Sequence, residues 1–184
     1  NAARAVAVLI GDAVLATAGG TIRIVRDDVG ATVDMGAPRF DWSAMPLAYA
    51  VDTAALPVAW DTLATPAAIH VGNPHLVFFV DDIAAIDLAT LGPRIEADAL
   101  FPERINVNVA MVTGTQSLTM RTWERGAGLT RACGTGACAT AVAAIRARHV
   151  VGPVAVTQPG GTLTIDWRAG ETMRMTGPAT HVFT

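Results

Sequence analysis

Cys133 is the side chain in this sequence best placed to do chemistry, because it stands where a helix of small apolar residues should begin. Gly134 and Gly136 flank Thr135, so the backbone there can turn tightly and come close to a ligand. The first amides of a helix have no intrahelical acceptor, and with the helix dipole they attract an anion. A thiol beside such amides suits chemistry on a substrate that carries a carboxylate. A buried structural cysteine at a glycine-rich turn is the alternative.

The position of Cys133 also carries an expectation about its ionisation. The field at a helix N-terminus favours a thiolate, so we expect the pKa of this thiol to be lowered. The second cysteine, Cys138, lies five residues along the same helix and on a different face. The two are poorly placed to form a disulfide, which fits a reducing, cytoplasmic compartment. We expect Cys138 and His149 to be structural.

Composition and charge exclude several classes of function for this chain. All 13 basic residues are arginine, so there is no lysine for a pyridoxal phosphate Schiff base or for a P-loop. The net charge of -3 gives no basic footprint for nucleic acid. No apolar run reaches the roughly 18 residues of a membrane span, and no signal peptide is visible. The histidines have no metal-ligand spacing, so we expect no metal.

Alternating and β-branched runs between turn residues predict an α+β chain. Strands are expected at 21–25, 31–35, 48–52, 67–71, 75–80, 105–113, 117–124, 154–157, 162–167 and 172–176. Helices are expected at 1–10, 87–96 and 134–148. The last of these carries no charge before Arg146, and a helix that is apolar all round must be buried on every side. Its small side chains let strands approach closely, so we expect a sheet wrapped around it.

A weak internal repeat relates the two ends of the chain. The string at 19–24 parallels the string at 160–165, and 35–38 parallels 175–178. Helix 1–10 likewise has the character of the helix at 134–148. We therefore expect two pseudo-symmetric domains, each a mostly antiparallel sheet or barrel wrapped around a central apolar helix. Residues 1–40 would belong to the first domain, 41–178 would form the second, and 179–184 would return to the first.

The repeat also predicts that the first domain lacks its beginning. The second unit has a long segment, 41–133, before its central helix, and the first unit has no counterpart of it. Asn1 then corresponds to Thr135, and the counterpart of Cys133 would precede Asn1.

Four strings are shared, in the same order, with one family of enzymes. They are V-D-M-G-A-P-R-F-D-W at 33–42, G-N-P-H at 72–75, I-N-V at 105–107 and E-R-G-A-G-L-T-R-A-C-G-T-G-A-C-A at 124–139. By them the chain resembles diaminopimelate epimerase over most of its length. The resemblance implies a homodimeric, cofactor-free isomerase of lysine and peptidoglycan precursor biosynthesis. Two thiols would interconvert LL- and meso-diaminopimelate, one removing the α-proton and the other returning it to the opposite face.

The resemblance also implies roles for particular residues. Cys133 would be one catalytic acid or base, and Glu124 and His75 would tune the thiol pair. Substrate binding is implied for Asn1, Asn73, Asn106, Glu124, Arg125, Gly134 and Thr135. Family members carry C-G-N at the first helix, and Asn1 of this chain would correspond to the asparagine of that string.

Purely structural roles are the alternative for several of these positions. Glu124 and Arg125 would serve equally as a surface pair, His75 as a satisfied core histidine, and Asn73 as a turn residue before proline. Asn108 stands where the family often has an acidic residue, which we interpret as a packing difference.

Two other functions stay open at this stage. One is a related isomerase of the same fold, such as a proline or hydroxyproline racemase or a phenazine-pathway isomerase, against which Glu124-Arg125 and G-N-P-H argue. The other is a non-catalytic binding domain left from an epimerase that has lost its first thiol.

Overall fold

The computed structural model describes residues 2–17, 20–27 and 30–178 of the chain, so Asn1 and the expected tail 179–184 lie outside the described residues. Three α-helices are described: α1 (Ala2–Ile10), α2 (Leu88–Glu96) and α3 (Gly134–Arg146). Strands β1 to β7 span Ala13–Thr17, Gly20–Asp27, Gly30–Asp34, Ala59–Trp60, Leu63–Ala64, Ala67–His70 and Pro74–Phe79. Strands β8 to β13 span Asn106–Gly114, Ser117–Glu124, Gly128–Thr130, Val154–Gln158, Gly161–Asp166 and Arg174–Gly177. A 3-10 turn covers Trp42–Ala44.

One mixed sheet runs through the whole molecule. In the part of the chain that the structure describes, its 11 strands follow the order β1-β2-β3-β13-β12-β11-β9-β8-β7-β6, with β10 paired to β9, and β4 and β5 form a separate hairpin. The pairs β7/β8 and β11/β9 are parallel and the other described pairs are antiparallel. The expectation of an α+β, mostly antiparallel fold is therefore confirmed. None of the described helices is long and apolar enough to cross a membrane.

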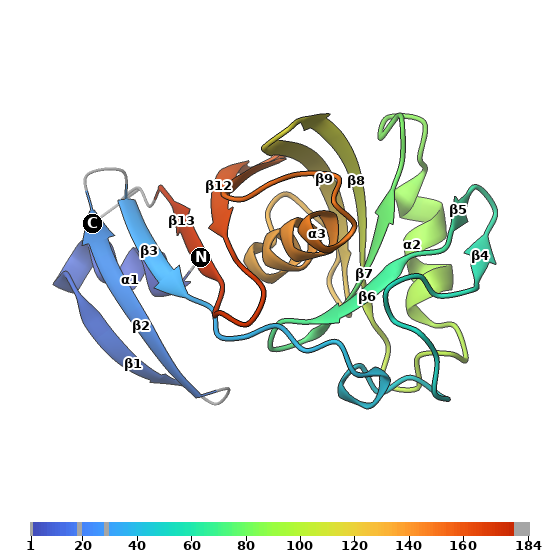
Figure 1. Ribbon diagram of the computed structural model, residues 1–184, viewed down its shortest axis with the longest axis horizontal. Helices are drawn as coiled ribbons and strands as arrows, with labels where there is room; N and C mark the ends of the chain where they lie inside the picture. Colours follow the sequence, from blue (N-terminus) through green and yellow to red (C-terminus); the bar gives the residue numbers. More distant parts are fainter. Residues whose placement is uncertain (1, 18–19, 28–29, 179–184) are drawn as a thin grey trace.

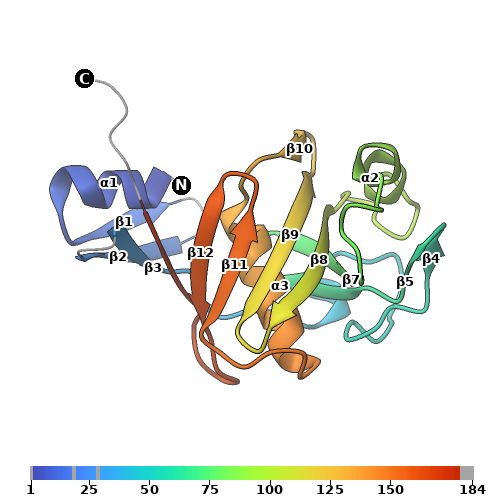
Figure 2. The same cartoon turned by 90° about the horizontal axis from the view of Figure 1, so that it is seen from above.

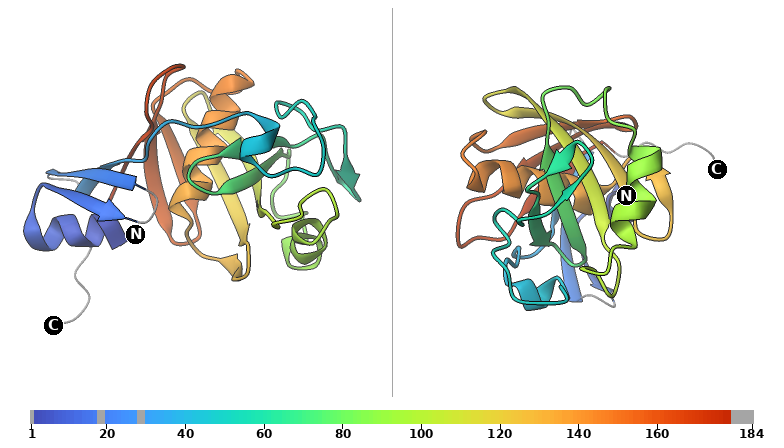
Figure 3. Two further views of the ribbon diagram at one scale, coloured as in Figure 1. Left: turned by 90° about the horizontal axis from the view of Figure 1, so that it is seen from below. Right: turned by 90° about the vertical axis from the view of Figure 1, so that its right-hand side faces the viewer.

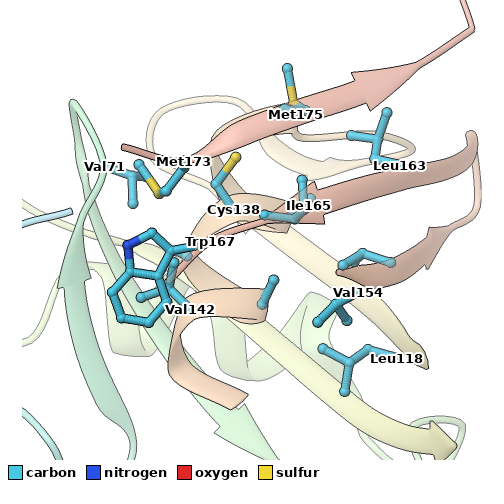
Figure 4. Close-up of a cluster of buried hydrophobic side chains, with 14 of the residues drawn as sticks. Val71, Leu118, Cys138, Val142, Val154, Leu163, Ile165, Trp167, Met173 and Met175 are labelled. Atoms are coloured by element: carbon cyan, nitrogen blue, oxygen red, sulfur yellow. The ribbon is translucent and has the colours of Figure 1, made fainter. Parts of the chain in front are cut away.

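Helix α3 lies inside the curve of this sheet, as its sequence predicts (Figures 1 and 2). It contacts strands β6, β7, β8, β9, β11 and β12, and every residue from Gly136 to Ala144 is buried. Alanine and glycine side chains allow this close approach because they add little width to the helix. Cys138 lies in this core near Ile165, Met173 and Met175 (Figure 4), which supports its structural role.

Strands β6 to β9 are covered on both faces, because alternate side chains point to opposite sides of a sheet. Val77, Ala110, Leu118 and Met120 pack against α3. Their neighbours Leu76, Phe78, Val107 and Val109 enter a second core with α2, on the outer side of the sheet (Figure 1). This alternation decides which polar residues of the same strands face α3.

Helix α1 and strands β1 to β3 form a smaller layer at one end of the molecule (Figure 3). Helix α1 packs on β2 and β3, and Leu9 and Ile10 at its end are exposed. In the described residues, strands therefore cover α1 on one side only, whereas they surround α3. Strand β3 pairs with β13, and Asp34 lies opposite Arg174. The internal repeat, which aligns 35–38 with 175–178, also makes Asp34 and Arg174 equivalent positions. The two repeat units therefore meet at this strand pair.

Most expected elements are present within two residues of their expected ends, but one strand is wrong. Residues 48–52 form a loop instead of a strand. The Ala48 N–H donates to Leu100 O, and within the range only Val51 packs against the second core, while the other four residues are exposed. Strands β1, β4, β5 and β10 were not expected. Helix α3 ends at Arg146 instead of 148, since Arg148 has a left-handed backbone with φ of 61°.

Candidate active site

Strand alternation gathers the polar site residues on one face of the sheet. His75 of β7 is paired with Asn106 of β8, and Asn108 is paired with Thr122 of β9. These residues occupy the α3 side, because the residues between them belong to the second core. Period-two patterning along three strands therefore brings residues far apart in sequence to the start of α3.

Cys133 is the N-cap of α3 and is almost fully buried. Its Sγ accepts the Gly136 N–H at 3.4 Å and lies 3.5 Å from Thr135 Oγ1. The first helical hydrogen bond runs from Ala137 N to Cys133 O, so the amides of Gly134 and Thr135 precede it. This is the arrangement expected from the sequence, with a thiol beside the first amides of a helix.

The Cys133 thiol lines a pocket of about 300 Å³ between α1 and the start of α3. Gly134, Thr135 and Glu124 line it from one side, and residues of the first 40, including Arg4 of α1, line the other. The pocket thus lies between the two repeat units, where an acid or base from each could face one substrate carbon.

The expected lowering of the Cys133 pKa is wrong in this structure. Burial raises the pKa of the thiol, and hydrogen bonds from Thr135 and Gly136 oppose that effect without overcoming it. The Glu124 carboxylate raises the pKa further through its charge and a hydrogen bond. The helix-terminus field acts in the expected direction, but desolvation of a nearly buried thiolate is the larger effect. The protonated thiol is therefore the favoured form.

His75 is fully buried and neutral. Burial lowers its pKa to about 3, with help from the charges of His70 and Arg125. Its Nε2 lies 3.0 Å from Asn73 Oδ1 and its Nδ1 lies 3.1 Å from Asn108 Nδ2. Its lowered pKa keeps His75 from titrating with the thiols near neutral pH.

Asn73, Asn106 and Arg125 form a cluster next to His75. Asn106 Nδ2 donates to Pro74 O at 2.8 Å, and its Oδ1 accepts the Arg125 N–H at 2.9 Å. The Arg125 side chain is exposed and donates to Glu103 O at 2.9 Å. These residues are absent from the lining of the described 300 Å³ pocket. Glu124, which lines the pocket, joins the two groups through its peptide bond to Arg125, and Asn1 lies outside the described residues.

Several polar contacts of the site could not be read from sequence motifs. Thr130 Oγ1 donates to Glu124 Oε1 at 2.5 Å, and the Cys133 N–H donates to Gln158 Oε1 at 2.7 Å. Asn108, interpreted from the sequence as a packing difference, instead carries buried hydrogen bonds. The sequence did hold one indication of these contacts. Strand alternation places Asn108 and Thr122 on the buried face of their strands, where a polar side chain needs a hydrogen-bond partner. Among the described residues no cluster of three metal-ligating side chains occurs.

The fold is similar to the folds of solved epimerases. A predicted epimerase from Pseudomonas aeruginosa has a similar structure, with a TM-score of 0.56 at 18% identity over 96% of this chain and 68% of that one. A hydroxyproline epimerase from Agrobacterium vitis has a TM-score of 0.58 at 16% identity, over 92% of this chain and 58% of that one. At these identities the likeness concerns the fold alone.

Comparison of the sequence with known proteins identifies the family, which the likeness of fold does not. The family model for diaminopimelate epimerase matches residues 67–182. Diaminopimelate epimerases from Erythrobacter litoralis and Rhizorhabdus wittichii are 61% and 59% identical, over 100% of this chain and 68% of their own length. The chain belongs to the diaminopimelate epimerase family, and the resemblance seen in its motifs is confirmed.

Proposed function

We propose that Cys133 is one of the two acid–base groups of a cofactor-independent diaminopimelate epimerase. The observation that carries this is the thiol at the N-cap of α3, inside a pocket that both repeat units line. One thiolate takes the α-proton from one face of the substrate, and a thiol returns a proton to the other face. No atom is gained or lost, and the two sulfur groups exchange roles in the reverse direction.

The start of α3 stabilises the charge that develops during this transfer. The electron pair left on the α-carbon spreads into the carboxylate, and the amides of Gly134 and Thr135 bind that group. Burial and Glu124 hold Cys133 as a thiol, which is the form that donates a proton. Cys133 is therefore the acid of the resting enzyme, and it becomes the base after one turnover.

The cluster of Asn73, Asn106 and Arg125 binds the distal amino-acid end of the substrate. A guanidinium can take the distal carboxylate as a bidentate pair, and the Asn106 contact holds the Arg125 backbone in place. A pairing of this kind favours diaminopimelate over proline or alanine, which have no distal carboxylate. The substrate is thus a small molecule with charged groups at both ends.

The same proposal includes the organisation of the protein. Residues 1–40 belong to one domain and 41–178 to the other, a division supported by the repeat and by the Asp34 to Arg174 pairing. A cytoplasmic homodimer is proposed on the family resemblance.

The test is an assay of the full-length enzyme on LL-diaminopimelate in deuterated water, without added cofactor. We expect meso-diaminopimelate to form with one deuterium at the inverted carbon. Proline and alanine serve as competing substrates. Equal rates on all three substrates would contradict the proposal and favour a racemase of broader specificity.

A further inference from the structure

Asn108 is a fully buried polar residue in the middle of the sheet, and both ends of its amide are hydrogen-bonded. Its Nδ2 donates to Leu76 O at 2.7 Å and lies 3.1 Å from His75 Nδ1. Its Oδ1 accepts from Thr122 Oγ1 at 3.0 Å. A buried amide is costly unless it is paired, so these contacts fix its position firmly.

The contacts also fix which end of the amide is nitrogen. A backbone carbonyl can only accept, so the group 2.7 Å from Leu76 O must be the Asn108 NH2. The other proton of that NH2 points at His75 Nδ1, which must then be an acceptor and carry no hydrogen. Asn108 therefore selects one of the two neutral tautomers of His75.

The selected tautomer determines the orientation of Asn73. A neutral imidazole has one N–H, and with Nδ1 unprotonated the hydrogen is on Nε2. That N–H donates to Asn73 Oδ1 at 3.0 Å. With its oxygen held by His75, the half-buried Asn73 has its Nδ2 left as the group to offer a ligand. An NH2 donor is the group that a substrate carboxylate requires.

Asn108 touches the other half of the site as well. A Cβ placed on Gly136 would lie 2.7 Å from Asn108 Oδ1 and 3.2 Å from Cys133 Sγ. The amide oxygen thus packs directly against the first turn of α3, so one side chain links the Asn73 cluster with the turn that carries the thiol.

We propose that Asn108 is a positioning residue that holds His75 in its Nε2–H tautomer and so turns the NH2 of Asn73 toward a carboxylate of the substrate. The inference rests on the proposed function for the identity of the substrate, but not for the tautomer. Asn108 acts through His75 and Asn73 and does not itself touch the substrate.

The direct test is nitrogen-15 NMR of the imidazole groups in the full-length enzyme without substrate. The His75 signals are assigned by their loss in His75→Gln. We expect a protonated Nε2 and an unprotonated Nδ1. A protonated Nδ1 in the unmodified enzyme would overturn the proposal, and this measurement needs no variant of Asn108 to fold.

Asn108→Asp tests the consequence for binding, because it replaces the NH2 with an OH of similar size: the buried carboxyl keeps its proton, donates it to Leu76 O, and has only a lone pair to turn toward His75 Nδ1. His75 must then donate from Nδ1, Asn73 turns its oxygen toward the substrate, and KM for diaminopimelate rises about tenfold or more. We expect kcat to change less than KM. Thr122→Val is the matched control: it removes a hydrogen bond of Asn108 at a buried site but leaves Leu76 O to fix the amide.

The Thr122→Val control decides whether Asn108 acts by positioning His75 and Asn73 or only by packing in the core. A His75 tautomer and a KM in Thr122→Val that match the unmodified enzyme support the proposal. An equal rise of KM in both variants, or an unchanged KM in a folded Asn108→Asp, overturns it. If the unmodified enzyme shows no turnover, the proposed function fails, while the NMR spectrum still decides the tautomer.

Discussion

Glu124 opposes the ionisation of Cys133: its carboxylate, held by a 2.5 Å hydrogen bond from Thr130, adds to the effect of burial in raising the pKa of the thiol. The same residue lines the pocket beside the thiol and is joined to Arg125, which we place at the distal end of the substrate. On the proposed assignment, acid–base chemistry and substrate recognition meet at consecutive residues, and the ionisation of the thiol can be tested separately from binding.

Glu124→Gln should move the ionisation of Cys133 to lower pH, because it removes a negative charge that repels the thiolate. The measurement is the rate at which iodoacetamide alkylates Cys133 against pH, with mass spectrometry of the Cys133 peptide to separate it from every other thiol. Glu171→Gln, an exposed glutamate without a contact to Cys133 in the described residues, should leave the profile unchanged. A profile that moves to higher pH in Glu124→Gln would contradict the assigned sign.

Cys133→Ala should abolish epimerisation, with kcat falling by about a hundredfold to ten-thousandfold or more, because it removes an acid–base group. Cys133→Ser should be nearly as poor, since a hydroxyl rarely ionises. Cys138→Ala is the matched control: burial raises the pKa of Cys138 to about 12, and the residue lies in the core. We expect it to lower the free energy of unfolding by about 1 kcal/mol and to leave kcat unchanged. Circular dichroism and turnover assays decide both.

Arg125→Lys should raise KM for diaminopimelate by about tenfold or more, because a point charge cannot reproduce a bidentate fork. The matched control is Arg104→Lys, a nearby exposed arginine that pairs with Glu96 at 3.4 Å. Steady-state kinetics of the two variants give the comparison. Equal KM values for the two would place the distal carboxylate elsewhere.

The 184-residue chain by itself should exchange the α-hydrogen of one isomer slowly and should not invert it. Of its two cysteines, Cys133 lines the pocket and Cys138 is fully buried in the core. A single thiol on one face can remove a proton and return it to the same face. Deuterium uptake followed by mass, with chiral chromatography, measures both events. Inversion at an enzymatic rate would reveal a second acid within these residues.

The stability of the fold should fall as the pH drops from about 6.5 toward about 3, in part because of His75. In the unfolded chain His75 binds a proton below its ordinary pKa of 6.5, while in the folded protein its pKa is lowered to about 3. The unfolded state therefore binds more protons between these values, which lowers the free energy of unfolding as the pH falls. Urea unfolding against pH should show a shallower fall in His75→Gln than in His149→Gln. A similar fall in both variants would show that His75 is not buried as a neutral base.

Much of the fold follows from local sequence patterns. An uncharged helix of small residues after Cys133 had to be buried, and the structure places it inside the sheet. Alternation gave the strand pair around Gly114, and the shared motifs gave the family, which the sequence comparisons confirm. Residues 48–52 were misread, because a loop over a core and a short strand have similar composition.

The sequence by itself determined the family, the central helix and the thiol at its start, because these depend on residues close together in the chain. Tertiary structure decided the rest. The raised pKa of Cys133 comes from burial and from Glu124, and the link between His75, Asn108 and Thr122 joins three strands. Desolvation and hydrogen bonds between distant segments exist once the sheet has closed around α3, so no local pattern records them.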